Sequence, residues 1–126
     1  MRVLVCDDNI DAAATLAVLL SHNRHDVRVC NDGASCVEKT REWRPQVALI
    51  DIGMPGLNGY EVARAIRRMD IGQDVLLIAV TGWGKEEDVR AARAAGFDMH
   101  FTKPADAAKL LGAVGTARSA RKEGGN

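Results

Sequence analysis

The chain has 126 residues, 47% of them hydrophobic, which suits a single globular domain with an ordinary core. Its 17 Lys and Arg balance 17 Asp and Glu, so zero net charge argues against bulk electrostatic capture of nucleic acid or anionic membranes. No 18-residue apolar run and no signal-peptide pattern is present, so we expect a cytoplasmic protein. The three cysteines show no C-x-x-C spacing and are expected to be reduced and buried.

Short apolar runs alternate with segments of helical spacing along the chain. The expected strands are 2–6, 26–30, 47–51, 75–80 and 97–102, and the expected helices are 11–22, 34–43, 58–69, 85–95 and 105–119. This alternation predicts an α/β protein with helices on both faces of a parallel sheet.

Right-handed crossovers leave few ways to order these strands, and the second strand, D-V-R-V-C, is the least apolar and suits an edge. We therefore expect a flavodoxin-like (βα)5 three-layer sandwich, with a central five-stranded parallel sheet in the order 2-1-3-4-5. One domain should cover 2–119, followed by a disordered tail over 120–126.

Polar groups stand at the carboxyl ends of four of the expected strands. Asp7 and Asp8 follow the first strand, Asp51 ends the third, Thr81 follows the fourth and Lys103 follows the fifth. Because the carboxyl ends of parallel strands share one edge of the sheet, these groups should converge there. Lone acidic pairs often only cap a helix, but the matching groups on the other strands favour a site.

Clustered carboxylates need a cation, because two unit charges about 4 Å apart repel by roughly 4 kcal/mol at an effective dielectric near 20. Mg²⁺ fits such a cluster, with Mn²⁺ as an alternative. An aspartate beside such a metal is suited to accept a phosphoryl group. Asp51 would be that acceptor, with Lys103 and the Thr81 hydroxyl holding phosphoryl oxygens and Gly82 offering an open backbone N–H.

The chain resembles the receiver domain of bacterial two-component response regulators over residues 2 to about 118. The motifs that carry the resemblance are Asp7-Asp8, D-I-G-M-P-G-L-N-G-Y-E from Asp51 to Glu61, Thr81-Gly82 and Thr102-Lys103-Pro104. The resemblance implies that Asp51 is the phosphoacceptor of a phosphorelay. It also implies that Asp8, Asp51 and the Gly53 backbone carbonyl bind Mg²⁺ directly, that Asp7 acts mainly through water, and that the Lys103–Pro104 peptide is cis.

The same resemblance implies a histidine kinase or phosphotransfer protein as the donor and a downstream protein as the target. Because the net charge is zero, we expect no direct binding of nucleic acid or membrane. Phosphorylation would change the face formed by the fourth helix, fifth strand and fifth helix. The protein would then be a switch that catalyses only its own phosphoryl uptake and hydrolysis. A stand-alone protein and an excised receiver of a larger chain, such as a hybrid histidine kinase, both remain open.

The sequence departs from the usual receiver pattern three residues before Lys103, where receivers carry a Tyr or Phe switch side chain and this chain has His100. Phe101 should point to the opposite side of the strand. The imidazole either swings toward Thr81 and makes the switch pH-sensitive, or is an exposed side chain without a switching role.

A second departure concerns the positions two residues after Asp51 and two after Thr81, which tend to tune phosphoryl lifetime in this family. Here they are Gly53, which has no side chain to position water, and Trp83. Trp83 either shields the site or forms part of a partner-binding surface. Shielding predicts slow or moderate self-dephosphorylation.

Three other functions compete with a receiver. A small flavodoxin-like enzyme or nucleotide-binding domain would need a glycine-rich phosphate loop after the first strand, where C-D-D-N-I-D-A stands instead. A phosphatase with an aspartate nucleophile would need a second acid at Gly53. A degenerate receiver that serves only as a scaffold would lack some acceptor-site residues, yet all are present.

Overall fold

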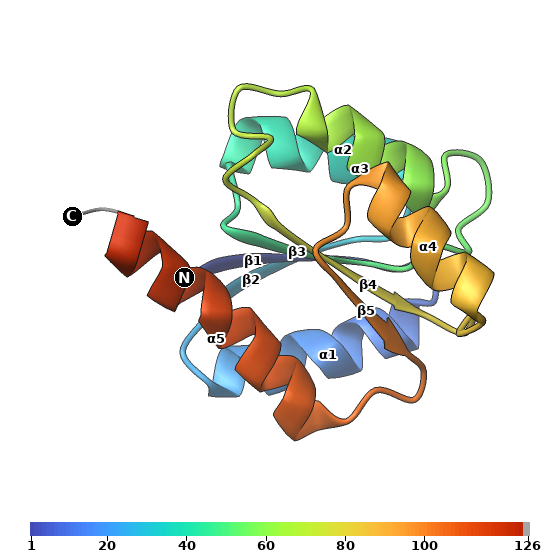
Figure 1. Ribbon diagram of the computed structural model, residues 1–126. Coiled ribbons are helices and arrows are strands. Elements are labelled where there is room, and N and C mark those ends of the chain that lie inside the picture. The colour runs from blue at the N-terminus through green and yellow to red at the C-terminus, as the bar shows by residue number, and fades with distance from the viewer. Residues whose placement is uncertain (125–126) are drawn as a thin grey trace.

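A computed structural model describes residues 1–124, and the side chains of residues 1–117. Strands and helices alternate throughout (Figure 1). The strands are β1 (Arg2–Cys6), β2 (Asp26–Cys30), β3 (Val47–Ile50), β4 (Leu76–Thr81) and β5 (Met99–Thr102). The helices are α1 (Ile10–His22), α2 (Gly33–Trp43), α3 (Gly59–Arg67), α4 (Glu86–Ala95) and α5 (Ala107–Gly124).

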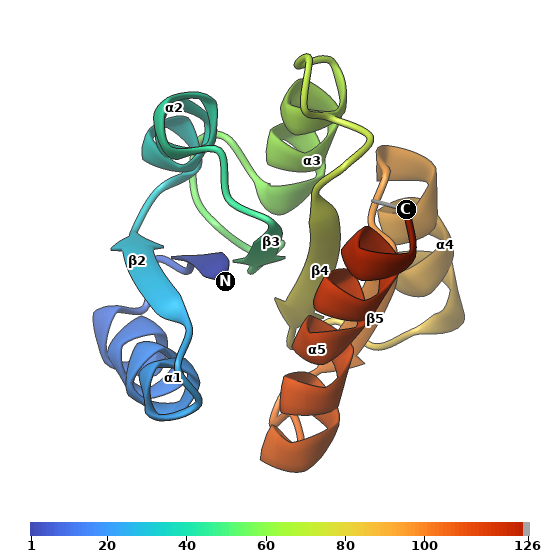
Figure 2. The same cartoon turned by 90° about the vertical axis from the view of Figure 1, so that its left-hand side faces the viewer.

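The five strands form one sheet in the order β2-β1-β3-β4-β5, and every pair of neighbours is parallel. The sequence prediction of the architecture and strand order is therefore confirmed, including β2 at an edge. Helices α2, α3 and α4 cover one face and α1 and α5 the other (Figures 1 and 2). Parallel pairing places the carboxyl ends of all strands at one edge, where the polar groups of the sequence motifs lie.

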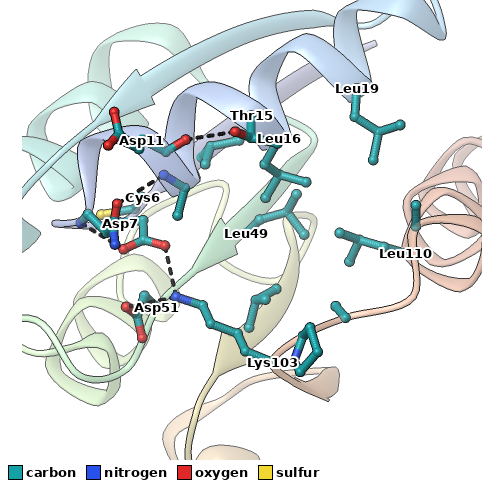
Figure 3. Close-up of a pocket in the computed structure, with 17 residues that line it drawn as sticks. Cys6, Asp7, Asp11, Thr15, Leu16, Leu19, Leu49, Asp51, Lys103 and Leu110 are labelled. Atoms are coloured by element: carbon teal, nitrogen blue, oxygen red, sulfur yellow. Dashed lines mark hydrogen bonds and ion pairs between the residues drawn. The ribbon is translucent and has the colours of Figure 1, made fainter.

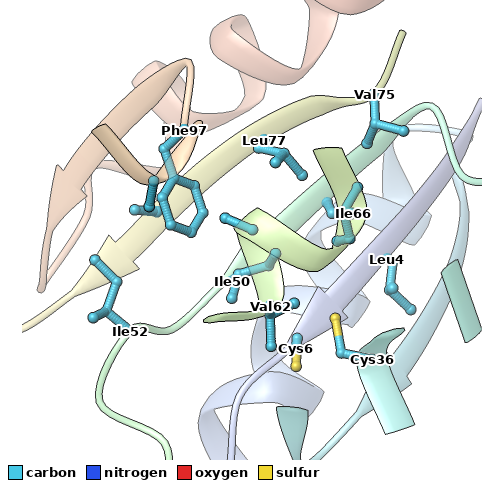
Figure 4. Packing of buried hydrophobic residues seen from close by; sticks show 14 of the residues in the cluster. Leu4, Cys6, Cys36, Ile50, Ile52, Val62, Ile66, Val75, Leu77 and Phe97 are labelled. Atoms are coloured by element: carbon cyan, nitrogen blue, oxygen red, sulfur yellow. The ribbon is translucent and has the colours of Figure 1, made fainter. Parts of the chain in front are cut away.

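Two apolar layers hold the helices on the sheet, because β1, β3 and β4 are buried on both sides. Alternate strand residues face opposite layers: Leu4 packs below α2 and α3, whereas Val3 and Val5 face α1 and α5. The first layer also holds Cys6 and Cys36 (Figure 4). All three cysteines are free and buried, as the sequence predicted.

Local sequence signals set most helix ends. The side chains of Asn9, Asp32 and Asn58 accept backbone N–H groups at the starts of α1, α2 and α3. Asn58 and Glu61 form a reciprocal capping box, which fixes the end of the loop that follows β3. Gly96 ends α4 at φ 114°, a left-handed conformation that favours glycine.

Arg67, at the end of α3, ties α3 to the turn after α4. Its guanidinium donates to the carbonyl oxygens of Gly96 at 2.6 Å and Val75 at 2.8 Å, and to the Asp98 carboxylate at 2.8 Å. Asp98 Oδ2 also accepts the backbone N–H of Leu77 at 2.9 Å. The carboxyl-terminal end of α4 is therefore anchored to both α3 and β4.

Several boundaries differ from the sequence prediction. Phe97 was expected in the fifth strand, but β5 begins at Met99 and Phe97 is buried in the turn before it, packed in the layer with α3 and α4. Helix α5 spans Ala107–Gly124 and therefore continues past residue 119. The disordered tail expected over 120–126 stays a prediction, and its last two residues lie outside the described residues.

None of the helices within residues 1–124 is both long enough and apolar enough to span a membrane.

Candidate functional site

The carboxyl ends of β1, β3 and β5 bring three charged side chains into direct contact (Figure 3). Lys103 Nζ donates to Asp7 Oδ2 at 3.0 Å and to Asp51 Oδ2 at 3.3 Å. Parallel pairing holds the strand ends together: the backbone N–H of Asp51 donates to the Cys6 carbonyl at 2.9 Å. The predicted convergence of these three residues is confirmed.

Asp8 belongs to the same cluster. One carboxylate oxygen from each of Asp7, Asp8 and Asp51 lies within 4.8 Å of the other two. Asp7 is buried, Asp51 is half-buried and Asp8 is exposed. Three acids therefore share a pocket that contains one ammonium group, and the pocket opens to solvent on the Asp8 side.

The pKa of Asp51 reflects its burial in this pocket. Burial raises the pKa of the Asp51 carboxyl above its ordinary value, and the charge of Asp7 adds to the shift. The Gly53 N–H, which donates to Asp51 Oδ1 at 3.1 Å, and the Lys103 ammonium oppose the shift without cancelling it. Desolvation of the carboxylate thus leaves the ionised form of Asp51 under-compensated, even with the Lys103 ammonium beside it.

The pKa of Lys103 moves in the direction that favours its charge. Burial of the ammonium alone would lower the pKa of Lys103, but the hydrogen bond to Asp7 and the charges of Asp51 and Asp7 raise it above its ordinary value. The two shifts are compatible because two anions together outweigh the burial of Lys103, whereas the burial of Asp51 outweighs its single cation. The pocket therefore favours an added cation.

Thr81 lies at the same edge but does not contact the carboxylates among the described interactions. It is fully buried, and its Oγ1 accepts the backbone N–H of Trp83 at 3.2 Å. Its carbonyl oxygen accepts the backbone N–H of Lys103 at 2.8 Å, which joins the ends of β4 and β5. Gly82 is exposed, and a side chain there would meet open space.

Gly53 and Trp83 lie against each other beside Asp51. A Cβ on Gly53 would be 3.6 Å from Trp83 Cζ2 and 3.8 Å from Asp51 Oδ1. The indole is 49% exposed and lies beside Gly53 while remaining open to solvent. These separations are ordinary van der Waals contacts, so a methyl side chain at residue 53 would also fit beside the indole.

His100 lies on the α4 side of β5. It pairs in register with Ala79, whereas Phe101 pairs with Val80 and packs in the layer that faces α1 and α5. The predicted opposite orientation of Phe101 is confirmed. The Lys103–Pro104 peptide is cis, as expected.

Sequence reasoning missed two groups that hold Asp7. The backbone N–H of Asn9 donates to Asp7 Oδ1 at 2.9 Å, and the Asn31 side chain donates to the Asp7 carbonyl at 2.9 Å. No sequence pattern joins Asn31 to a residue 24 positions earlier.

A groove of about 890 Å³ between α1 and α5 also escaped the sequence reasoning, although it opens at the acidic cluster (Figure 3). Leu16, Leu19, Leu49, Val80 and Leu110 form much of its apolar wall.

The family model described as "Response regulator receiver domain" matches residues 3–115. Among curated proteins, an uncharacterised 14.6 kDa protein of Leptolyngbya boryana is 30% identical over 111 residues, covering 88% of this chain and 85% of that protein. The transcriptional regulatory protein PrrA of Mycobacterium leprae is 35% identical over 113 residues, which cover 90% of this chain and 48% of PrrA. The chain thus spans about half the length of PrrA.

Solved structures of similar proteins share the fold. A CheY-like receiver domain protein from Methanospirillum hungatei superposes with a TM-score of 0.88 at 24% identity, covering 97% of both chains. The receiver domain of a sensor histidine kinase from Pseudomonas aeruginosa superposes with a TM-score of 0.81 at 27% identity, covering 87% of this chain and 90% of that one. That receiver has a magnesium ion coordinated in its active-site cleft.

Proposed function

The chain belongs to the response regulator receiver domain family, which acts in phosphorelay signalling, and we propose that its acidic cluster accepts a phosphoryl group on Asp51. The observation that carries this proposal is the under-compensated Asp51 carboxylate, held by Lys103 at 3.3 Å at the open edge of a parallel sheet. An anionic nucleophile next to a fixed ammonium suits phosphoryl transfer, which depends mostly on positioning and charge neutralisation.

The cluster also fits a divalent cation. Its oxygen donors are the ligands that Mg²⁺ prefers, and three carboxylates with oxygens within 4.8 Å of one another need added positive charge. Asp8, Asp51 and the Gly53 carbonyl would hold the ion, with Asp7 acting through water, and Mn²⁺ is an alternative. When bound, the ion neutralises charge on the phosphoryl oxygens.

Four residues of the site take part in the proposed transfer. A carboxylate oxygen of Asp51 forms the new bond to phosphorus as the phosphorus–nitrogen bond of a donor phosphohistidine breaks, and the electron pair leaves with the donor imidazole. Lys103 holds one phosphoryl oxygen. The Thr81 hydroxyl turns from the Trp83 N–H to donate to another oxygen, and the open backbone at Gly82 lets the group approach.

The donor would be a histidine kinase or a histidine phosphotransfer protein. Ile10 and Val18, which are 68% and 57% exposed, lie eight residues apart on α1 and therefore about 80° apart around that helix, within one broad apolar side. This apolar stripe begins three residues after Asp7, so a helix of the donor can pack on it while presenting its phosphohistidine to Asp51. Such a phosphorelay would operate in the cytoplasm, without direct contact to nucleic acid.

The output is a change in the face formed by α4, β5 and α5. A charge-assisted hydrogen bond from Thr81 contributes about 1.5–3 kcal/mol. Full conversion of a two-state equilibrium from 1:99 to 99:1 requires about 5.5 kcal/mol. Phosphorylation alone therefore shifts the population in part, and a partner that prefers the phosphorylated form completes the change. That partner is a protein, or another part of a longer chain.

Gly53 and Trp83 set the lifetime of the phosphoryl group. The indole beside Asp51 excludes water from one side, and Gly53 offers no polar side chain to orient a hydrolytic water. We expect slow or moderate self-dephosphorylation.

The deciding experiment is intact-mass measurement after incubation with acetyl phosphate, with and without Mg²⁺. The expected result is the addition of one phosphoryl group that requires both Mg²⁺ and Asp51. Asp51→Asn is the matched variant, because it keeps the shape of the side chain and removes the nucleophile. A folded wild-type protein that gains no mass would favour a receiver that serves only as a scaffold.

A further inference from the structure

His100 occupies an incompletely filled seam between α4 and β5. Its Nε2 atom is buried and has no hydrogen-bond partner among the described residues. A cavity of about 20 Å³, enough for a single water molecule, adjoins the ring. No hydrogen bond from a described side chain or backbone group therefore holds the Nε2 side of the imidazole in place.

The residues that line the cavity beside His100 are mostly apolar. Arg93 of α4 and Asp98 are the charged residues that line the adjoining cavity, and Ala79 of β4 is opposite in register. The Asp98 carboxylate is already engaged by Arg67 and by the Leu77 N–H. A protonated imidazole has two N–H donors, and the described residues of this seam offer Nε2–H no hydrogen-bond acceptor.

The seam is connected to the acceptor pocket through the ends of β4 and β5. Lys103 follows His100 by three residues, and its backbone N–H donates to the Thr81 carbonyl. The Thr81 hydroxyl holds the Trp83 N–H, and Trp83 lies in the segment that leads into α4. If the Thr81 hydroxyl turns to a phosphoryl group, the segment before α4 loses the hydrogen bond from the Trp83 N–H. Arg67 anchors only the opposite, carboxyl-terminal end of α4.

We propose that His100 is a positioning residue that couples proton uptake to phosphorylation: the resting seam holds only the neutral imidazole, and the phosphorylated conformation releases the ring to solvent as imidazolium. This inference rests on the proposed phosphoacceptor function and adds a regulator to it. Acidification and phosphorylation then shift the α4–β5 seam in the same direction. By linkage, a lower pH must strengthen binding of a phosphoryl group or its mimic at Asp51.

The test is an NMR titration of the histidine rings between about pH 5 and 8, the range in which histidine usually changes charge. It is run on the wild-type protein, first alone and then with Mg²⁺ and beryllium fluoride as the phosphoryl mimic. The titration midpoint of His100 should rise by about one pH unit in the presence of the mimic, a tenfold gain in proton affinity. His22, which is exposed on α1, serves as an internal control and should not shift.

A second measurement compares mimic affinity at about pH 6 and 8 in the wild type and in His100→Gln. Glutamine keeps a hydrogen-bonding side chain but does not titrate. The wild type should bind the mimic up to about tenfold more tightly at the lower pH relative to His100→Gln. A His100 midpoint that is unchanged or lowered by the mimic, or the same pH dependence in both proteins, overturns the proposal.

Failure of this inference is distinguishable from failure of the proposed function. If acetyl phosphate adds a phosphoryl group at Asp51 but His100 does not respond, only the coupling is wrong. If Asp51 is not modified at all, the phosphoacceptor function itself fails.

Discussion

Replacing Asp51 with asparagine should stabilise the protein when no divalent cation is present. The substitution keeps the size of the side chain and removes one of three carboxylates whose oxygens lie within 4.8 Å of one another. It also removes the ion pair between Asp51 and Lys103 at 3.3 Å. The sign of the effect depends on whether the lost repulsion exceeds the lost attraction.

The geometry allows both quantities to be gauged at an effective dielectric near 20. The contact of Asp51 with Lys103 at 3.3 Å is worth about 5 kcal/mol. Each repulsion, from Asp7 and from Asp8, is at least about 3.5 kcal/mol at 4.8 Å or less. Solvent screens part of the repulsion from exposed Asp8, so we expect the variant to gain about 1–2 kcal/mol.

The pH dependence follows from the raised pKa of Asp51. A raised folded-state pKa means that the folded protein binds more protons at this site than the unfolded chain does. The cost of ionised Asp51 is therefore absent below the unfolded pKa of about 3.9, and it grows as pH rises towards the folded pKa. Above the folded pKa the cost is fully present, so the advantage of Asp51→Asn should be largest near neutral pH.

Thermal unfolding followed by circular dichroism in excess EDTA and in excess MgCl₂ checks this reasoning. In EDTA, the variant should melt higher by about 4 °C for each kcal/mol gained. Mg²⁺ at one hundred times its dissociation constant should stabilise the wild type by about 2.7 kcal/mol and the variant far less, which removes or reverses the difference. A variant that melts lower than the wild type in EDTA would show that the Lys103 ion pair dominates and would refute the argument.

Three further substitutions probe the framework and the switch. Arg67→Met should cost about 3 kcal/mol or more in urea unfolding, because the Gly96 and Val75 carbonyls lose the guanidinium donor and the Asp98 carboxylate keeps only the Leu77 N–H. Arg41→Met breaks only an exposed ion pair and should change stability by less than about 1 kcal/mol, so equal losses would contradict this prediction. Gly59→Ala should lower the free energy of unfolding by about 1–3 kcal/mol, since its Cβ would lie 2.6 Å from a backbone atom of the loop after β3. Gly112→Ala on α5 meets open space and should raise the free energy of unfolding by up to about 1 kcal/mol. A change in the same direction for both variants would contradict this packing argument. Thr81→Ala should leave phosphoryl uptake, measured by intact mass, largely unchanged and weaken phosphorylation-dependent partner binding; parallel loss of both would show that Thr81 acts in uptake itself.

The sequence predicted the elements of the site because strand topology carries polar groups to a known place. Asp7, Asp51 and Lys103 each follow an apolar run, and parallel strands bring their carboxyl ends together whatever the details of packing. The order of the strands was also predictable, since β2 is the least apolar strand and lies at an edge. The boundaries were less predictable: Phe97 has strand propensity, but it fills the core from a turn after the glycine that ends α4.

The sequence by itself determined the class of fold, the edge of the sheet that carries the site and the residues delivered there, because these follow from periodicity and chain order. Only the tertiary structure decided how those residues interact: Lys103 bridges two acids, the Thr81 hydroxyl binds the Trp83 N–H instead of facing the carboxylates, and the Nε2 of His100 is buried without a partner. These features depend on the side-chain conformations and desolvation of groups far apart in sequence, which no local pattern encodes.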